Sequence, residues 1–591
     1  MGTQGRIAIG ARGRLAYGEQ SEWEKAVIPT QMLDFNTESL KNELAYLVSE
    51  AQDPSRGTKN SKTNTSNING DYVFEQSTQG RETLYKHALG DHVTMQKVDG
   101  GVRTKVASAF AGGAGAITVD DTTGFEDTPS TDWGLVAVYK DATGNIVTQN
   151  LAYSALTSTT FTLTGAPTAI PKGAWIMQRY IGASDFWDAI YTHYIEASAV
   201  LPAGLTFEVG RDVAYFVYEG LKVNTVENTF TAGELLGGTF GFMGRAEYVG
   251  GLLVADVTAG DTSFQLKDYT LTNSGHISAP VLSGVGLDDL SSSGTFTGTE
   301  PSTYIVEITA AGTPDTFRWS DDGGVTWTTG VAITGAAQLL SKGVSVTFAA
   351  TTGHTLGDKW YVQTGDIIGF NFAGATIQME AENDITYTSY NAYDGTFSGV
   401  PASGAGSISY DHLANLPVAP QSTWGTPAAA PDVEPLASFE AALFLNGKAQ
   451  EVLGANFTLN NNLYADKYQL GTRIRAGLAE QKRTVEGSLN VEFDDTVMYH
   501  DYLAGTPAFL EIRCIEAARR LDSQGVGTAP ADHWVYAQKH CILPKIKYSG
   551  STPNITGPEQ IVHDMPFTAL IDSANNMNEL AVIFVNTRAS I

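Results

Sequence analysis

Residues 485–493 read Val-Glu-Gly-Ser-Leu-Asn-Val-Glu-Phe, and residues 499–505 follow them with Tyr-His-Asp-Tyr-Leu-Ala-Gly. The first run alternates between apolar and polar side chains, which is typical of a strand with one buried face. The same order occurs near the start of the chain, where residues 69–75 read Asn-Gly-Asp-Tyr-Val-Phe-Glu and residues 84–90 read Leu-Tyr-Lys-His-Ala-Leu-Gly. The two ends therefore look like copies of one β unit, and such a repeat is more typical of proteins that build symmetric rings than of enzymes.

The composition favours an all-β-dominated fold with several domains. The chain has 591 residues, of which 62 are glycine, and only 17% of its residues are charged. At about 150 residues per domain it holds roughly three to five domains. Glycine supplies the positive φ angles that tight turns between strands require. We therefore expect a duplicated β-sandwich or barrel domain that carries small inserted β-sandwich modules.

Shifts to Gly-, Ala-, Thr- and Ser-rich sequence mark the expected insertions. The predicted organisation is a first copy in residues 1–107 and 180–250, an inserted β module in 108–179, a second inserted module in 251–291 and 366–415, a nested β module in 292–365, a Pro-rich linker in 416–435 and the second copy in 436–591. The linker holds Pro417 and Pro420 among its five prolines. Because proline lacks an N–H, we expect this segment not to pair as a central strand.

Two segments of the first copy have a helical pattern. Residues 37–48 place apolar side chains at helical spacing, but the matching segment of the second copy alternates as a strand does, so we favour a strand for the first half of this segment. Residues 186–194 predict a short amphipathic helix.

The chain is strongly acidic, with 64 acidic and 36 basic side chains and a formal charge of −28. This charge argues against a basic groove that wraps nucleic acid, because such grooves bind phosphates through lysine and arginine. A conduit that DNA passes without sticking is compatible with the charge, and ordinary solubility is the simpler interpretation.

The two cysteines, Cys514 and Cys541, lie in apolar strand-like runs. They could pair, but buried thiols are the favoured interpretation. No apolar run reaches the about 18 residues that span a bilayer, and the N-terminus shows no secretory signal. We therefore expect synthesis and first folding in the cytosol, with no membrane insertion by this chain.

No motif for catalysis, a metal or a cofactor is found. The ten histidines are scattered, without zinc spacing or a phosphate loop. Adjacent carboxylates point to opposite faces of a strand, and Asp-Gly is ordinary turn chemistry. The best carboxylate groupings are Asp120 with Asp121, Asp321 with Asp322, and Asp494 with Asp495. We expect no enzyme, no cofactor and no metal site.

Three tryptophans of the nested module, Trp319, Trp327 and Trp360, allow an alternative. Exposed rings could stack on sugars, whereas small β-sandwich cores also contain such rings, and the core interpretation is favoured. The corresponding alternative function is a multi-module adhesin or carbohydrate-binding surface protein. Nesting of modules inside a duplicated domain argues against it, because adhesins usually string their modules end to end.

Several runs of the two copies follow the pattern of one family of structural proteins. They are Gly5-Arg6-Ile7-Ala8-Ile9-Gly10, Tyr218-Glu219-Gly220-Leu221-Lys222-Val223-Asn224, Arg483-Thr484-Val485-Glu486-Gly487-Ser488-Leu489 and Leu543-Pro544-Lys545. In pattern and order the chain resembles the tail tube proteins (major tail proteins) of long-tailed bacteriophages. The nested module separately resembles a β module that recurs in phage structural proteins.

The resemblance implies a structural virion protein. Its sheets would join around an axis into a ring lined by a β-barrel, and rings would stack into the tail tube through which the genome passes into the host cell. The family expectation is six tube-domain equivalents per ring, so a duplicated chain implies a trimeric ring with pseudo-sixfold symmetry, and a hexamer is the second choice. Implied partners are the chain itself, tape measure and tail terminator or tip proteins, and DNA in transient, non-specific passage. Assembly in the host cytoplasm would place the protein in the virion tail.

Two sets of residues are candidates for this function. The polar loops 52–69 and 478–483 occupy equivalent positions, and in the family such a loop packs on the neighbouring ring; the basic side chains at their tips are Arg56, Lys59, Lys62, Lys482 and Arg483. Opposite charges on stacked faces would then align the rings, although plain solvated loops are the alternative. The expected lumen face consists of Glu486, Ser488, Asn490 and Glu492, whose acidic members would repel phosphates. An ordinary half-buried strand explains the same alternation.

Overall fold

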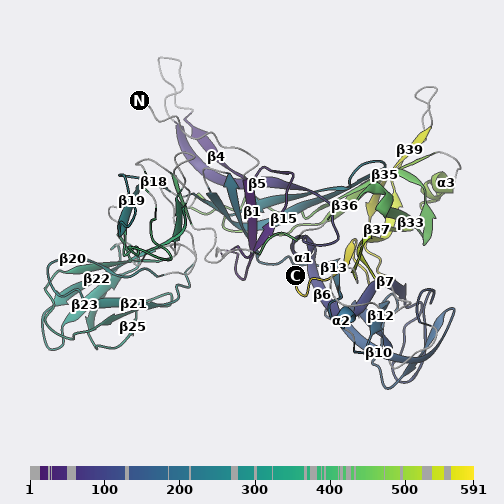
Figure 1. The fold of residues 1–591 in the computed structure, drawn as a ribbon, viewed down its shortest axis with the longest axis horizontal. Helices are drawn as coiled ribbons and strands as arrows, with labels where there is room; N and C mark the ends of the chain where they lie inside the picture. Colours follow the sequence, from purple (N-terminus) through teal and green to yellow (C-terminus); the bar gives the residue numbers. More distant parts are fainter. Residues whose placement is uncertain are drawn as a thin grey trace, which may run out of the picture.

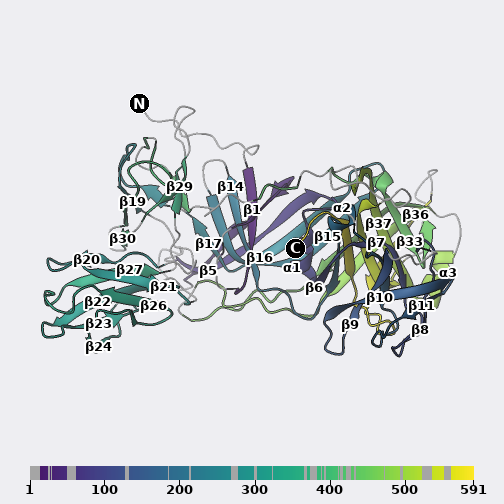
Figure 2. The same ribbon diagram turned by 60° about the horizontal axis from the view of Figure 1, so that its bottom comes forward.

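The computed structural model is an elongated, mostly β protein (Figure 1). Strands β1 (Gly13–Gln20), β5 (Ser61–Glu75) and β15 (Tyr215–Thr231) lie in the middle, the strands between residues 281 and 348 lie at one end, and the strands between residues 441 and 569 lie at the other (Figures 1 and 2). The structure describes residues 13–23, 27, 29–49, 61–126, 132–183, 185–211, 215–249, 251–267, 277–298, 302–322, 324–364, 369–372, 382–387, 389–391, 395–409, 411–412, 417–420, 428–431, 434–470, 473–492, 497–521, 535–550 and 561–591. The predicted all-β-dominated fold class is confirmed.

The N-terminal part of the main sheet contains seven strands that follow one another in space. They are β2 (Gln31–Leu33), β1 (Gly13–Gln20), β14 (Gly204–Arg211), β15 (Tyr215–Thr231), β16 (Gly237–Gly244), β5 (Ser61–Glu75) and β4 (Lys41–Val48). Each strand pairs antiparallel with the next. A helix, α1 (Glu82–Leu89), follows β5 along the chain.

The C-terminal part repeats this arrangement. Its strands are β34 (Lys448–Gln450), β33 (Ala441–Leu445), β37 (Ala508–Arg520), β38 (Tyr536–Tyr548), β39 (Val562–Ala569), β36 (Thr484–Glu492) and β35 (Val452–Asn460). Again each strand pairs antiparallel with the next. Helix α3 (Val497–Ala504) follows β36 as α1 follows β5. The two parts therefore have the same order of strands both along the chain and across the sheet.

Strand β15 joins the two parts of the sheet. Its second half pairs with β16 on one side and with β35 on the other, over a register that runs from Thr225 opposite Asn460 to Thr231 opposite Gly454. One hydrophobic core spans both parts and includes Phe240, Phe457 and Leu489. Burial of this shared core favours a single packed body over two separate domains.

Residues 37–48, whose pattern is ambiguous, form the strands β3 (Thr37–Glu38) and β4. The prediction of a helix over residues 186–194 is wrong beyond its first turn. Helix α2 (Asp185–Asp188) is short, and β13 (Tyr191–Ala197) follows it. β13 lies between β6 (Gly90–Gln96) and β40 (Ala581–Asn586), and this two-sided pairing outweighs the local helical pattern.

A separate six-stranded sheet lies beside the C-terminal part (Figure 1). In spatial order it contains β7 (Val98–Lys105), β12 (Trp175–Tyr180), β9 (Trp133–Lys140), β10 (Ile146–Thr157), β11 (Thr160–Thr164) and β8 (Gly115–Thr118). This sheet thus begins at Val98, before residue 108. Trp133, Trp175 and Trp187 pack in one cluster with Ile583 and Val585 of β40, so the sheet is attached to the main body by a buried aromatic contact.

A seven-stranded sheet follows the N-terminal part. In spatial order it contains β29 (Glu382–Thr386), β28 (Gly369–Phe372), β32 (Pro417–Pro420), β18 (Gly251–Leu253), β19 (Ser263–Lys267), β31 (Thr396–Ser398) and β30 (Ser389–Asn391). β32 is central, so the prediction that the proline-rich segment does not pair in this way is wrong for these four residues. Its prolines stand at the two ends, while Val418 and Ala419 keep their N–H groups between them.

The remaining sheets form the outermost module (Figure 2). One has the spatial order β20 (Val281–Ser283), β27 (Lys359–Thr364), β22 (Ser302–Ala310), β23 (Thr316–Ser320) and β24 (Thr328–Ala332). The other contains β21 (Leu290–Gly294), β26 (Val344–Phe348) and β25 (Gln338–Leu339). β20 and β21 belong here, so these sheets begin before residue 292. Phe317, Phe348 and Trp360 are among the residues that fill the core.

Candidate functional site: a polar sheet face and its open edges

Strand β36 has one apolar and one polar face. Val485 and Leu489 are buried, and Leu489 is 0% exposed. The candidate lumen residues point the other way: Glu486, Asn490 and Glu492 are exposed, and Ser488 is half-buried. Ser488 donates its hydroxyl to Asp564 on β39. The structure thus brings all four residues together on one open face.

This polar face continues across the neighbouring strands. On one side Asp564 of β39 lies opposite Asn490. On the other side Thr458 of β35 lies opposite Glu486, and Glu227 of β15 lies opposite Thr458. Glu227 and Asp564 are both exposed. The face therefore crosses the β15–β35 junction without interruption.

The face extends further over β16 and β5. Thr239 lies opposite Glu227, and Asp71 and Glu75 follow on β5, opposite Gly241 and Gly237. Sequence reasoning missed these acidic residues and Glu227. The alternation that marks β36 was available in β15, where exposed Glu227 and Thr229 alternate with buried side chains.

Buried aromatic side chains pack on the side of the sheet opposite the polar face. The rings of Tyr72 and Phe74 stack at 5.2 Å between centroids, and Phe74 stacks on Phe240 at the same distance. All three rings are buried. Such contacts add to the stability that burial already supplies and hold the strands in one surface.

The candidate loop residues lie in different surroundings. Arg56 and Lys59 fall outside the described residues. Lys62 is exposed on β5, opposite Leu47 of β4. Lys482 is exposed, whereas Arg483 is held in the body: it donates to the Ser198 carbonyl at 2.7 Å and pairs with Glu579 at 2.9 Å.

The segment between β35 and β36, residues 461–483, lies against the N-terminal part. Arg475, 2% exposed, donates to the carbonyls of Ile68 and Gly244 at 2.8 Å each. The Ser66 amide donates to the Arg473 carbonyl at 2.8 Å. These contacts fasten the segment to β5 and β16 within the same chain.

Strand β4 forms an open edge with an unusually apolar surface. It pairs with β5 alone among the described strands. Leu44, Tyr46, Leu47 and Val48 are 45%, 64%, 59% and 56% exposed. An unprotected edge of this kind can pair with another chain.

A second open edge lies on β38. In the N-terminal part, β14 covers one side of β15 as far as Leu221, and β35 covers that side from Thr225 onward. On β38, β37 covers the corresponding side as far as Ile546. From Lys547 onward, no strand of the described part of the chain pairs on this side. The position that β35 occupies on β15 is thus open on β38.

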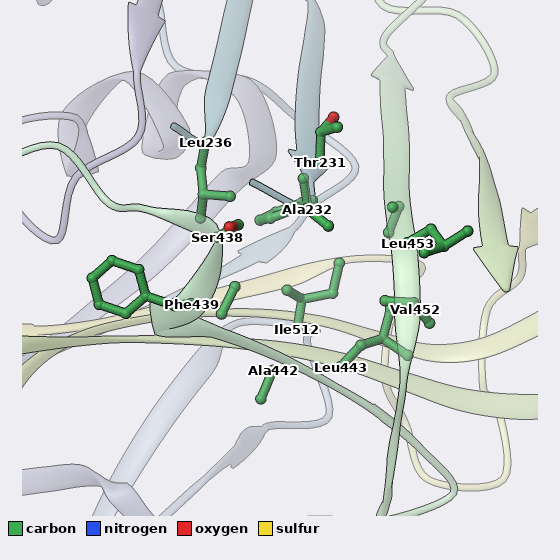
Figure 3. Close-up of a pocket in the computed structure, with 14 residues that line it drawn as sticks. Thr231, Ala232, Leu236, Ser438, Phe439, Ala442, Leu443, Val452, Leu453 and Ile512 are labelled. Atoms are coloured by element: carbon green, nitrogen blue, oxygen red, sulfur yellow. The ribbon is translucent and has the colours of Figure 1, made fainter. Parts of the chain in front are cut away.

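The pocket beside the β15–β35 junction is apolar. It has a volume of about 140 Å³ and is lined by Leu236, Leu443, Ile512 and other residues without any titratable side chain (Figure 3). The ring of Phe439 at its rim is 83% exposed. The described residues contain no group of three or more His, Cys, Asp or Glu that could hold a metal.

The predicted carboxylate pairs form turns where they are described. Asp121 accepts from the amide and the hydroxyl of Thr123, and Asp322 accepts from Ser320 and Thr326. The hydrogen bonds from Thr326 and Ser320 hold the pKa of Asp322 well below its ordinary value. Asp494 and Asp495 fall outside the described residues.

The three tryptophans of the outermost module and the two cysteines are buried or half-buried. Trp360 is 0% exposed, whereas Trp319 and Trp327 are half-buried. Cys514 and Cys541 are buried and free. Burial raises the pKa of Cys514 to about 12. The two thiols are offset by two residues on adjacent strands, a diagonal spacing that is too long for a disulfide.

These features define a class of β proteins: a continuous polar sheet face lies over a packed core, with open strand edges at its margins. A family model described as phage tail tube protein matches residues 251–569, more than half of the chain. The chain belongs to this family, which makes it a structural protein of the virion tail. A search of curated proteins finds no match. Among the described residues, no helix is long and apolar enough to cross a membrane.

Proposed function

We propose that three copies of this chain close into a ring, that rings stack into the tail tube, and that the genome passes through the lumen. The carrying observation is the β15–β35 junction, in which the first strand of the C-terminal part extends the sheet of the N-terminal part. The matching strand order of the two parts supports a duplicated tube domain. Three duplicated chains supply the six equivalents that a ring of this family is expected to contain.

The same junction provides a model for the contact between chains. β4 occupies in the N-terminal part the place that β35 occupies in the C-terminal part, at the outer margin beside β5 or β36. β38 occupies the place of β15, and its side beyond Ile546 is open among the described strands. Pairing of β4 with β38 of the next copy would continue the sheet around the ring and remove both open edges.

The polar face fits the lumen of this ring. Its acidic side chains include Asp71, Glu227, Glu486, Glu492 and Asp564. Negative charge repels the phosphates of passing DNA, so the genome stays mobile. The proposed lumen surface thus contains the four predicted residues of β36 and further acidic residues from both parts of the chain.

Stacking of rings is assigned to the basic side chains that precede β5 and begin it. Lys62 is exposed near the start of β5, and Arg56 and Lys59 belong to the same basic stretch of sequence. Opposite charges on the facing ring would align the two. The tape measure protein inside the tube and terminator or tip proteins at its ends are the further partners of this assembly.

Electron microscopy of the purified chain, with the mass of the smallest closed particle, tests the proposal. Rings or tubes of constant diameter with the mass of three chains per ring are expected. A six-chain ring would refute the duplicated arrangement, and a chain that stays monomeric at high concentration would refute the tube.

Ring closure has its own test in the edge strand. A Tyr46→Glu, Leu47→Glu double variant places charge on the exposed side chains of β4 and should abolish rings while the monomer stays folded. Leu356→Glu is the matched control, because Leu356 is 65% exposed in the outermost module. Normal rings from the β4 variant would exclude this edge as the contact.

A further inference from the structure

A buried lysine on β38 of the C-terminal part contacts side chains of the N-terminal part, including Asn228 of β15. Lys539 of β38 is 1% exposed, and its Nζ contacts three side chains of the N-terminal part. Nζ donates to Gln76 Oε1, to the Tyr85 hydroxyl at 2.7 Å and to Asn228 Oδ1 at 3.3 Å. All three contact atoms are uncharged, so the amine is buried without a carboxylate among these contacts.

Burial disfavours the charged form of this amine. Desolvation is the largest cause and lowers the pKa of Lys539, although the neighbouring Cys541 and Cys514 oppose the shift. Nζ also lies over the ring of Tyr85, 4.5 Å from its centroid. A neutral amine is a nucleophile, whereas an ammonium is not.

The carboxamide of Asn228 is arranged as the acceptor of such an attack. Its Oδ1 accepts from the Tyr85 hydroxyl at 2.5 Å and from Gln76 Nε2 at 2.7 Å. Two donors on one carbonyl oxygen stabilise the negative charge that develops there when an amine adds to the carbon. Asn228 is 0% exposed, and its Nδ2 has no hydrogen-bond partner among the described residues.

We propose that Lys539 and Asn228 form an intramolecular isopeptide bond. Nζ of the neutral lysine adds to Cγ of Asn228, and the new C–N bond forms as charge moves to Oδ1. The Cγ–Nδ2 bond then breaks, and Nδ2 leaves as ammonia after it takes one proton from Nζ. The Tyr85 hydroxyl accepts from Nζ and donates to Oδ1, so it can take the proton from Nζ as it gives its own to Oδ1. That proton passes from Oδ1 to Nδ2 of the same carboxamide as the C=O bond re-forms and the Cγ–Nδ2 bond breaks.

Gln76 is the competing carboxamide, since its Oε1 also contacts Nζ. Its Nε2 donates to Asn228 Oδ1 and to the Gly237 carbonyl at 2.9 Å, so the nitrogen that would have to leave is held by two hydrogen bonds. The unbonded Nδ2 of Asn228 has no such restraint. The bond to Asn228 would tie β15 to β38 and close residues 228–539 into a covalent loop.

Intact mass spectrometry of the purified full-length chain tests the bond. The expected mass is lower than the sequence mass by one ammonia, and a digest should contain a branched peptide that joins Lys539 to Asn228. A mass equal to that of the sequence, with normal tryptic cleavage after Lys539, overturns the proposal. A branch to Gln76 overturns the assignment of Asn228.

Variants separate the bond from other losses of ammonia. Lys539→Met should restore the sequence mass, whereas Lys547→Met, an exposed lysine on the same strand, should retain the loss. A succinimide at Asn69-Gly70 or Asn446-Gly447 also releases ammonia, but hydroxylamine cleaves it and Lys539→Met does not remove it. A loss with those two properties overturns the proposal. If Lys539→Met does not fold, the branched peptide of the unaltered chain decides the question alone.

Discussion

Replacement of Arg475 by alanine should release the 461–483 segment from the N-terminal part of the sheet. The guanidinium donates to the carbonyls of Ile68, Gly244 and Ala465 at 2.8, 2.8 and 2.9 Å. It is the one side chain of the segment's second half, residues 473–483 as described, that reaches both β5 and β16. Arg475→Ala therefore removes three charge-assisted hydrogen bonds and leaves three carbonyls without this donor.

The size of the effect follows from these contacts. Hydrogen bonds to charged groups contribute about 1.5–3 kcal/mol each, and water that enters the vacated space recovers part of the loss. We expect about 3–4 kcal/mol for the opening of the segment. Since about 1.4 kcal/mol corresponds to a factor of ten, the opening equilibrium should shift by about two to three orders of magnitude.

Hydrogen exchange measures this opening directly. The reporting amides are those of Ser66, which donates to the Arg473 carbonyl, and of Tyr464 and Ala476, which donate within the segment. Their protection should fall by the stated factor, while amides of β36 change little. Arg473→Ala is the matched control, because that side chain is exposed. Unchanged protection of the three amides in Arg475→Ala would refute the reasoning.

Three further predictions concern the core and the polar face. Burial raises the pKa of Glu208 from an ordinary 4.5 to about 7 in spite of Arg14, so the protonated carboxyl contributes stability that is present below about pH 4.5 and is lost as the pH rises through 7. Glu208→Gln should therefore raise the free energy of unfolding at pH 8 by roughly 2–3 kcal/mol, with a higher melting temperature, and should not raise either at pH 4.5. Leu489→Ala should cost about 2–5 kcal/mol in denaturant unfolding, because the side chain is fully buried; a cost below 1 kcal/mol would contradict its core position. A Glu227→Lys, Glu486→Lys variant should still form tubes but should slow DNA ejection from assembled particles, and unchanged ejection kinetics would exclude this face from the lumen.

The polar face shows what sequence can predict locally. Alternation in residues 485–492 identifies the open side of β36 because a strand places successive side chains on opposite faces. The neighbours of β36 are not visible in this way. Glu227 and Glu486 share one face only because β35 lies between their strands, and that pairing joins segments more than 200 residues apart.

The repeat located the two helices without revealing that they are helical. Residues 84–90 and 499–505 correspond in order, and α1 and α3 include most of them. Residues 82–89 read Glu-Thr-Leu-Tyr-Lys-His-Ala-Leu, in which polar pairs and apolar pairs alternate at helical spacing, so the helical signal was present in the sequence. The strand β13 shows the opposite error, since its pattern predicts a helix while pairing on both sides makes it a strand.

The equivalent strands β4 and β35 differ in the way that the proposed ring requires. β35 meets β15 of its own chain, where the connecting polypeptide already keeps the partner at high effective concentration. Its outward side chains, Asn456 and Thr458, are polar. β4 must gain its partner from another molecule, so burial of apolar area has to offset the loss of translational freedom. Its exposed Tyr46 and Leu47 provide this area. A duplicated chain that used both strands within one molecule would have no need for the difference, and this asymmetry favours a ring that is closed between chains by β4.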